Sequence, residues 1–140
     1  MTVTDYEQGN ITGDIMFFNR PAGSKLIDRG DPAVYDFTVG NFIKDGDWHE
    51  LDLSAIVPAA AIGVLLKLSL EADTAGSGVS FRKHGNVNNK NMGILRQPVA
   101  DSYHEGHIFT FCDAQGKVDY MVHLAVWTTL SIAVRGWFKR

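Results

Sequence analysis

The sequence predicts an all-β protein, an antiparallel two-sheet β-sandwich that is jelly-roll-like and carries an N-terminal arm. Fourteen glycines and many Asn and Asp residues cut the 140-residue chain into short segments. Such punctuation at intervals of roughly ten residues is typical of sandwiches and barrels. Several segments also alternate apolar and polar residues, as half-buried strands do. An immunoglobulin-like sandwich is the alternative, but its Cys…Trp…Cys spacing is absent because the chain has one cysteine.

The clearest predicted strand runs from residue 61 to residue 72. One side of this strand is aliphatic, with Ile62, Val64, Leu66, Leu68 and Leu70. The other side is mixed, with Leu65, Lys67, Ser69 and Glu71. A period of two predicts a strand with one buried face, whereas a helix would scatter Lys67 and Glu71 around an apolar cylinder. We therefore expect Leu66 and Leu68 to be buried and Lys67 to lie on the opposite side.

The other strands are shorter and are separated by turn residues. They are predicted at 34–39, 48–53, 78–83, 91–99, 108–112, 118–124 and 130–138, with a further one at 14–19. The residues at 44–47 and at 113–116 are typical of tight turns. The second of these turns, with Gly116 in the left-handed region, predicts a hairpin of the strands at 108–112 and 118–124. In the strand at 78–83, Val79 and Phe81 are expected to face the core.

The chain is predicted to divide into an N-terminal arm, residues 1–30, and a β-sandwich domain, residues 31–140. The arm is polar and Gly-rich and has no periodic apolar face, whereas eight core strands follow it. One domain is the usual outcome for a chain of this length. Arg29-Gly30-Asp31 matches a cell-adhesion tripeptide, but its neighbours Asp28 and Pro32 favour a turn that leads into the first core strand.

Charge and apolar runs exclude several classes of partner. Thirteen basic and sixteen acidic residues give a net charge of −3, so no nucleic-acid partner is expected, because phosphate binding needs a basic surface. No apolar run approaches the roughly 20 residues of a membrane helix, and no signal peptide is recognisable at the N-terminus. The single cysteine, Cys112, lies in an apolar segment and is expected to be a buried thiol of a protein that folds in a reducing compartment.

No motif of the sequence indicates catalysis, so the protein is expected not to be an enzyme and to need no cofactor. A phosphate-binding glycine loop and a Gly-x-Ser-x-Gly motif are both absent. His104 and His107 are three residues apart, and on a strand such residues point to opposite faces. No metal site is therefore predicted. The carboxylates between residues 45 and 52 surround a glycine and are expected to be solvated turn residues.

The segment at 85–91 holds the strongest candidate for a ligand site. Its side chains offer uncharged hydrogen-bond donors and acceptors through Asn86, Asn88, Asn89 and Asn91. Such a loop suits sugar hydroxyls, and Trp127, if it is exposed, is the natural ring for a sugar to stack on. The alternative is a long turn, because Asn tolerates left-handed backbone conformations. A carbohydrate-binding, lectin-like module is therefore the second function that we consider.

Apolar residues also occupy strand faces that are expected to be exposed to solvent. The residues concerned are Leu65, Phe109, Phe111, Met121 and Trp137. Phe109 and Phe111 share one side of their strand, and simple alternation places Trp137 on the face opposite Leu130. A strand that is apolar on both faces needs a cover on both, and large exposed patches usually mark interfaces. The sequence therefore predicts a homo-oligomer.

Several segments resemble small β-sandwich proteins of phage and prophage virions. They are residues 48–54, 56–59 and 64–66, the stretch 81–88 and the closing stretch 127–137. The resemblance covers residues 34–138 and involves turns and strand faces. It implies a non-enzymatic virion accessory protein of the head-decoration or tail-fibre type, a trimer that is assembled in the bacterial cytoplasm. Capsid or tail proteins would then be its partners, and the N-terminal arm would anchor it to them.

Overall fold

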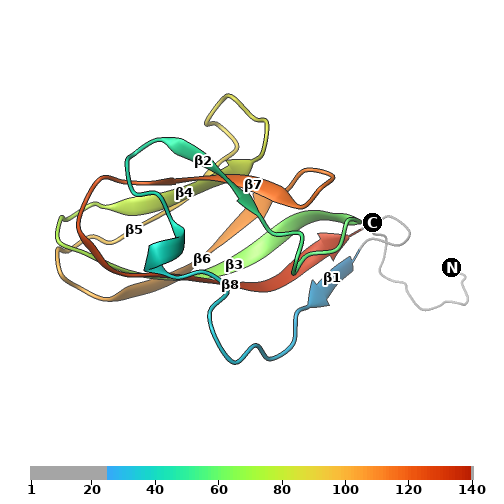
Figure 1. Cartoon of the computed structure of the whole chain (residues 1–140), viewed down its shortest axis with the longest axis horizontal. Helices are drawn as coiled ribbons and strands as arrows, with labels where there is room; N and C mark the ends of the chain where they lie inside the picture. The colour runs from blue at the N-terminus through green and yellow to red at the C-terminus, as the bar shows by residue number, and fades with distance from the viewer. Residues whose placement is uncertain (1–24, 140) are drawn as a thin grey trace, which may run out of the picture.

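The computed structural model describes residues 25–139, which form two four-stranded antiparallel sheets packed face to face (Figure 1). The strands are β1 (Lys25–Asp28), β2 (Trp48–Asp52), β3 (Ala61–Ala72), β4 (Gly78–Lys83), β5 (Gly93–Arg96), β6 (His104–Phe111), β7 (Lys117–Val122) and β8 (Trp127–Lys139). A short 3-10 turn, η1 (Val39–Asn41), precedes β2. The prediction of an all-β sandwich is confirmed.

The strand order is that of a jelly roll. The first sheet has the order β1-β8-β3-β6 and the second sheet the order β2-β7-β4-β5. Apart from the β4–β5 hairpin, every connection within the described residues passes from one sheet to the other. Two Greek keys that share a core in this way define the jelly-roll arrangement.

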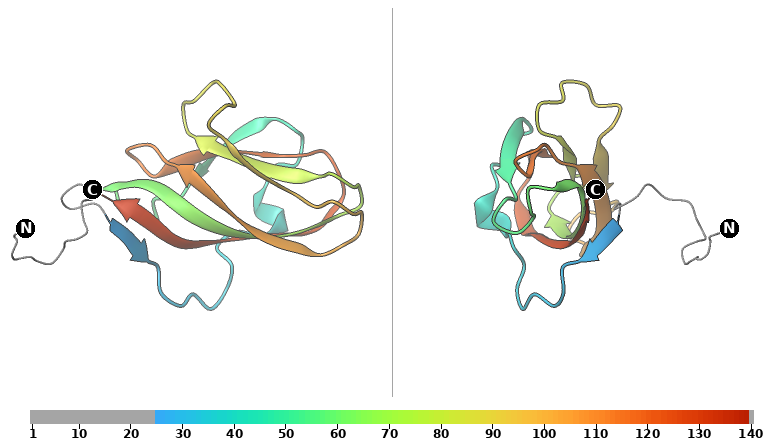
Figure 2. Two further views of the ribbon diagram at one scale, coloured as in Figure 1. Left: turned by 180° about the vertical axis from the view of Figure 1, so that it is seen from behind. Right: turned by 90° about the vertical axis from the view of Figure 1, so that its right-hand side faces the viewer.

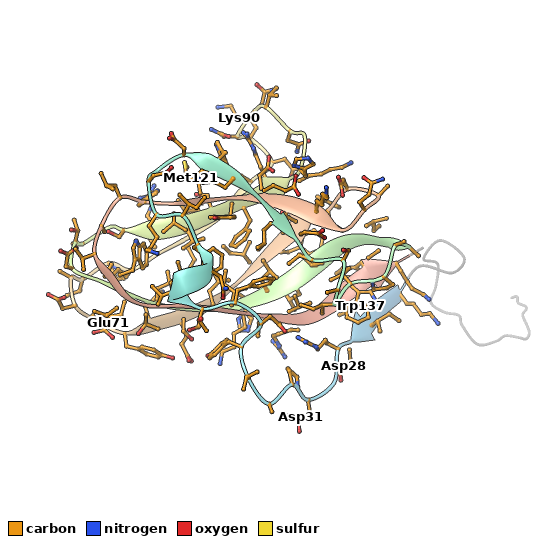
Figure 3. The ribbon with its side chains drawn as sticks, viewed as in Figure 1. Asp28, Asp31, Glu71, Lys90, Met121 and Trp137 are labelled. Atoms are coloured by element: carbon orange, nitrogen blue, oxygen red, sulfur yellow. The ribbon has the colours of Figure 1, made fainter. Side chains whose placement is uncertain are left out.

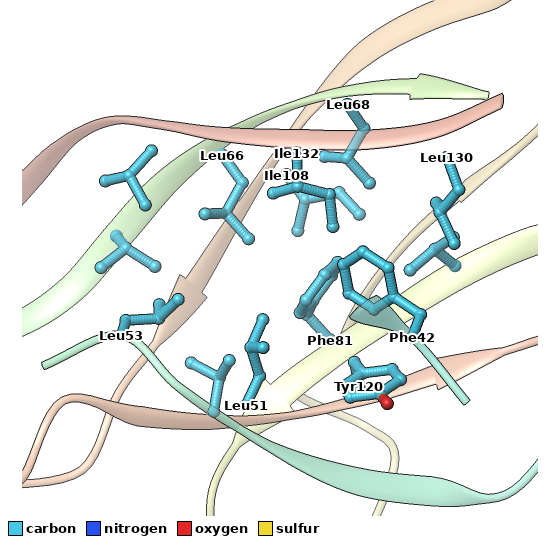
Figure 4. Packing of buried hydrophobic residues seen from close by; sticks show 14 of the residues in the cluster. Phe42, Leu51, Leu53, Leu66, Leu68, Phe81, Ile108, Tyr120, Leu130 and Ile132 are labelled. Atoms are coloured by element: carbon cyan, nitrogen blue, oxygen red, sulfur yellow. The ribbon is translucent and has the colours of Figure 1, made fainter. Parts of the chain in front are cut away.

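The core lies between the two sheets, and β3 contributes most to it. This strand has the predicted bounds, and Leu66 and Leu68 are fully buried whereas Lys67 is on the other side. From the second sheet, Phe81 and Tyr120 point toward these leucines (Figure 4). The ring of Phe42 closes the space and meets Tyr120 edge-on at a centroid distance of 5.1 Å. The alternation along β3 therefore identified the buried face correctly.

The predicted strand at 34–39 is wrong, and the first strand of the sandwich is instead β1, which lies within the range assigned to the arm. Between β1 and η1 the chain forms an irregular segment, residues 29–36, that we call the strap. Only Phe37 makes a strand-like bridge, to Ile132 of β8. The carboxylate of Asp36 accepts the N–H of Val134 at 2.8 Å, so a side chain takes the place of a backbone partner there. Figure 2 shows the strap standing away from the sandwich.

The turn at 113–116 is confirmed, but the hairpin that it was expected to join is wrong. Gly116 has a φ of +76°, and Asp113 accepts its N–H at 3.0 Å through the backbone carbonyl. The strands on either side belong to opposite sheets, since β6 pairs with β3 while β7 lies between β2 and β4. Ile108 and Val118 are both buried because they cover the core from opposite sides.

The predicted strand at 14–19 and most of the predicted arm fall outside the described residues. Within residues 25–139 there is no helix with the length and hydropathy needed to cross a bilayer.

Candidate functional site

The outer face of the first sheet carries a cluster of exposed aromatic rings. Phe109 and Phe111 of β6 are 39% and 41% exposed, and Phe138 of β8 is 38% exposed. The ring of Phe109 packs edge-on against both others, with centroid distances of 5.0 Å to Phe111 and 5.6 Å to Phe138. Edge-to-face stacking holds these rings in one arrangement. Three phenylalanines are therefore kept together on a surface that faces solvent.

Aliphatic residues extend this cluster across all four strands of the sheet. Leu65 of β3 lies directly opposite Phe109, and Leu26 of β1, which is 52% exposed, lies opposite Phe138. The ring of Phe109 also covers Gly63, where a Cβ would lie 2.5 Å from the Phe109 Cζ. We call Leu26, Leu65, Phe109, Phe111 and Phe138 the aromatic patch.

Three of the five residues predicted for an interface belong to the aromatic patch, namely Leu65, Phe109 and Phe111. Met121 does not, because it lies on the outer face of the second sheet between Trp48 and Ser80. Figure 3 places Met121 and Asp31 on opposite sides of the molecule.

The predicted orientation of Trp137 is wrong, and Phe138 takes the place on the outer face that it was expected to have. Leu66 pairs with Val134 but Leu65 pairs with Gly136, so Arg135 is an extra residue that forms a β-bulge. The bulge turns Trp137 inward, opposite the buried Val64 and against the core. It equally turns Phe138 outward. The glycine at position 136 was the available signal, since glycine inside a strand often marks a bulge.

The four predicted asparagines lie together in the connection between β4 and β5. Asn88, Asn89 and Asn91 are exposed and Asn86 is partly buried. The loop stands out from the second sheet, on the side of the molecule opposite the strap (Figure 1). Asn89 Oδ1 accepts a hydrogen bond of 2.8 Å from the Arg82 guanidinium, which fixes the loop to the sheet.

The prediction of Trp127 as a stacking surface is wrong. This side chain is 7% exposed, and its Nε1 donates to the carbonyl of His123 at 3.0 Å. It lies opposite Ala72, beside the start of β4, whereas the asparagines follow the end of β4. Trp127 and the Asn-rich loop are therefore at opposite ends of the sandwich.

Trp48 is the aromatic residue that the structure brings near the Asn-rich loop, and it was not singled out from the sequence. The Arg82 guanidinium stacks over the Trp48 ring at 4.0 Å from its centroid. Arg82 therefore links the ring to Asn89. Trp48 and Arg82 are 34 positions apart and lie in strands that do not pair, so only the sheet order brings them together.

A charged network lies beside this tryptophan on the outer face of the second sheet, and Arg82 connects the two. Asp119 Oδ1 is 2.7 Å from His84 Nδ1, and Asp119 Oδ2 is 3.6 Å from Arg82 Nε. Glu50 lies 3.6 Å from His84 Nε2 and 3.3 Å from the Lys117 ammonium. Asp119 accepts a hydrogen bond from the His84 imidazole, and this bond raises the pKa of His84 above its ordinary value. The network presents polar groups suited to holding a polar ligand.

The remaining candidates are the two histidines of β6 and Cys112. His104 and His107 lie on opposite faces of β6, where His104 pairs with Leu70 and His107 pairs with Lys67. Residues 25–139 contain no set of three His, Cys, Asp or Glu side chains placed to hold a metal. The prediction that Cys112 is buried is confirmed. Burial raises the pKa of its thiol.

No protein-family model matches the chain, and no curated protein matches it.

Proposed function

We propose that the chain is a non-enzymatic structural protein of a phage-like particle, a head-decoration or tail-fibre-like module that assembles as a homotrimer. The observation that supports this proposal is the aromatic patch, which leaves three phenylalanine rings on the outside of a single sheet. Fold alone would not support it, because jelly rolls serve capsids, lectins and enzymes alike.

A second copy of this chain is the partner that the aromatic patch suits best. Burying apolar surface contributes about 25 cal/mol per Å², so a patch of aromatic rings gains from any flat apolar cover. Cyclic symmetry offers every subunit the same patch and the same cover. The number three comes from the resemblance of residues 34–138 to phage virion proteins. The same resemblance is the reason to propose that the protein assembles in a bacterial cytoplasm and contacts capsid or tail proteins.

Light scattering during size-exclusion chromatography tests the assembly. A mass of three times the chain's 15.4 kDa at micromolar concentration is the expected result. A mass of 15.4 kDa would overturn the oligomer, and a stable dimer would overturn the number of subunits. Co-purification with phage particles, after expression beside a complete set of virion proteins, tests the virion role.

Carbohydrate binding is the second candidate, and the stack of Arg82 on Trp48 beside Asn89 favours it. Sugars are held by aromatic rings together with amide and carboxylate groups, and Trp48, Asn89 and Glu50 supply one of each on the same face. A glycan-array screen tests this candidate. Binding that is lost in Trp48→Ala and in Asn89→Ala, but kept in Leu124→Ala at the other end of the sandwich, would support it. An array without any bound glycan would reject it.

A further inference from the structure

A pocket of about 470 Å³ lies between the strap and the outer face of the first sheet. Its floor is β8 at Ala133–Arg135 together with Lys67 of β3, and its wall is the strap from Gly30 to Tyr35 with Asp28 beside it. Figure 3 shows Asp28 and Asp31 along this part of the chain. A volume of this size is in the range that accepts small molecules.

The strap is fastened at both ends, so the pocket is preformed. At its start, Arg29 N–H donates to the Arg135 carbonyl at 3.0 Å. At its end, the Asp36 carboxylate accepts a hydrogen bond of 2.7 Å from each Nη atom of Arg29 and one of 2.8 Å from the Val134 N–H. The residues between these two attachment points span the pocket, and the attachments reduce the ordering that a ligand would have to impose.

Two cationic side chains line the pocket, and neither is strongly neutralised. Lys67 makes a loose ion pair with Glu105 at 3.6 Å and lies 5.7 Å from the centre of the Tyr35 ring. None of the ion pairs among residues 25–139 involves Arg135, and its Nη1 contacts His107 Nε2 at 3.2 Å. A guanidinium only donates hydrogen bonds, so the histidine nitrogen must be the acceptor. An imidazole nitrogen is a modest partner for a group that pairs best with oxyanions.

The rest of the lining is compatible with an anion that carries a small organic body. Pro32, Ala33 and Val34 give the strap an apolar inner surface. The one carboxylate of the lining, Asp28, is engaged through Oδ1 with the Gly30 N–H at 2.9 Å. Tyr35 donates to or accepts from Ser69 at 2.8 Å, which orients its ring along the wall.

We propose that this pocket binds a small organic oxyanion, a carboxylate or a phosphate, between Arg135 and Lys67. Arg135 would grip two oxygens of the anion with its planar fork, and Lys67 would supply a second charge from the neighbouring strand. The inner surface of the strap would cover the body of the ligand. The lining of the pocket shares no residue with the aromatic patch or with the Asn-rich loop, although Lys67 follows Leu65 by two positions on the same face of β3. The proposal uses none of the observations that support the function proposed above.

Titration of the ¹⁵N-labelled full chain at low salt tests the proposal, with glucuronate, inorganic phosphate and glucose as separate probes. Glucuronate and glucose share a ring and differ in the carboxylate, so they isolate the charge. Saturable shifts of the amides at 28–36 and 133–135 with glucuronate or with phosphate are expected, and the tighter of the two identifies the anion. No saturable shift with either of them, or equal binding of glucose, would overturn the proposal.

Three variants locate the binding. Arg135→Gln and Lys67→Gln should each weaken the anion by about tenfold, because each removes one charge-assisted contact. Lys90→Gln removes the same charge from the Asn-rich loop and should leave the affinity unchanged; Lys90 lies far from Asp31 in Figure 3. Native spectra of the three variants guard against unfolding. Equal affinity of all three variants and the unaltered chain would overturn the assignment.

Discussion

Arg29 and Asp36 form a two-pronged ion pair, with each Nη atom 2.7 Å from a different carboxylate oxygen. The pair is attached to β8 on both sides, since Arg29 donates to the Val134 carbonyl at 3.0 Å and Asp36 accepts the Val134 N–H at 2.8 Å. The backbone N–H and carbonyl of Val134 thereby have hydrogen-bond partners at a point where no strand pairs with this edge of β8. A side-chain pair here performs the task of backbone pairing.

Replacing Asp36 with Asn should lower the free energy of unfolding by about 2–3 kcal/mol at neutral pH, because a largely buried, charge-assisted set of hydrogen bonds is lost. Asp31→Asn changes the same functional group at an exposed position of the strap. It should change the stability by less than about 0.5 kcal/mol. Urea unfolding of the two variants and the unaltered chain gives the comparison. Equal stability of the two variants would contradict the role of the ion pair.

The same carboxylate predicts a dependence of stability on pH. Burial by itself raises the pKa of Asp36, but the hydrogen bonds from Arg29 and Val134, together with the charge of Arg29, outweigh it and leave the pKa lowered. A carboxyl with a lowered folded pKa stabilises the protein above its unfolded pKa of about 4, and this stabilisation is lost as the pH falls through the folded value. Between pH 7 and pH 3, Asp36→Asn should therefore lose less stability than the unaltered chain. Parallel losses would show that Asp36 is not the titrating group.

Leu66→Ala and Leu68→Ala should each cost about 2–5 kcal/mol, because both side chains are fully buried between the sheets. Lys67→Ala truncates the residue between them, whose side chain is on the wet face, and should cost far less. Thermal or urea unfolding, with circular dichroism as the signal, measures the three changes. A Lys67→Ala cost as large as that of either leucine would contradict the facing of β3.

The parts of the fold that follow from simple alternation could be predicted from the sequence. Strand β3 has the bounds expected from its period of two, and so does β4, in which Val79 and Phe81 are fully buried as expected. In such strands the burial of one face is set by local sequence, and the pairing partner does not alter it. The number and spacing of such strands favour a sandwich or a barrel, whereas the jelly-roll order depends on which strands pair.

Other features could not be predicted because they depend on pairing at a distance. The bulge at Arg135 reverses which faces Trp137 and Phe138 occupy, and alternation alone has no means to detect it. The segment around Asp36 looks like a strand, but its side chain bonds β8 in place of its backbone. Trp48 reaches the Asn-rich loop only through Arg82 of a non-adjacent strand. The sequence grouped the Asn-rich loop with Trp127, which is buried, whereas the structure places Trp48 near that loop.

Cys112 should react slowly with a thiol reagent in the folded protein. Its side chain is buried, and burial raises the pKa of the thiol, so the reactive thiolate is both inaccessible and scarce. Labelling at pH 8 with a chromogenic disulfide should be slow in buffer and complete within seconds in strong denaturant, which serves as the control. Rapid labelling of the folded chain would contradict the position of Cys112 at the end of β6.

The final prediction concerns the aromatic patch as the proposed contact between subunits. Phe109→Glu and Leu65→Glu each place a charge on the outer face of the first sheet, where the two side chains lie opposite each other across β6 and β3. A charge buried without a partner is costly, so each substitution should dissociate the oligomer. Neither should unfold the monomer, because both positions have access to water in the isolated subunit.

Val87→Glu is the matched control for these two changes, since Val87 is also an exposed apolar residue but belongs to the Asn-rich loop. We expect light scattering to give the mass of one subunit, 15.4 kDa, for Phe109→Glu and Leu65→Glu, and the mass of the intact oligomer for Val87→Glu. Circular dichroism should be that of a folded β protein in all three. Dissociation by Val87→Glu alone would move the contact to the second sheet. Loss of folding together with assembly would instead show that the first sheet needs its partner in order to be stable.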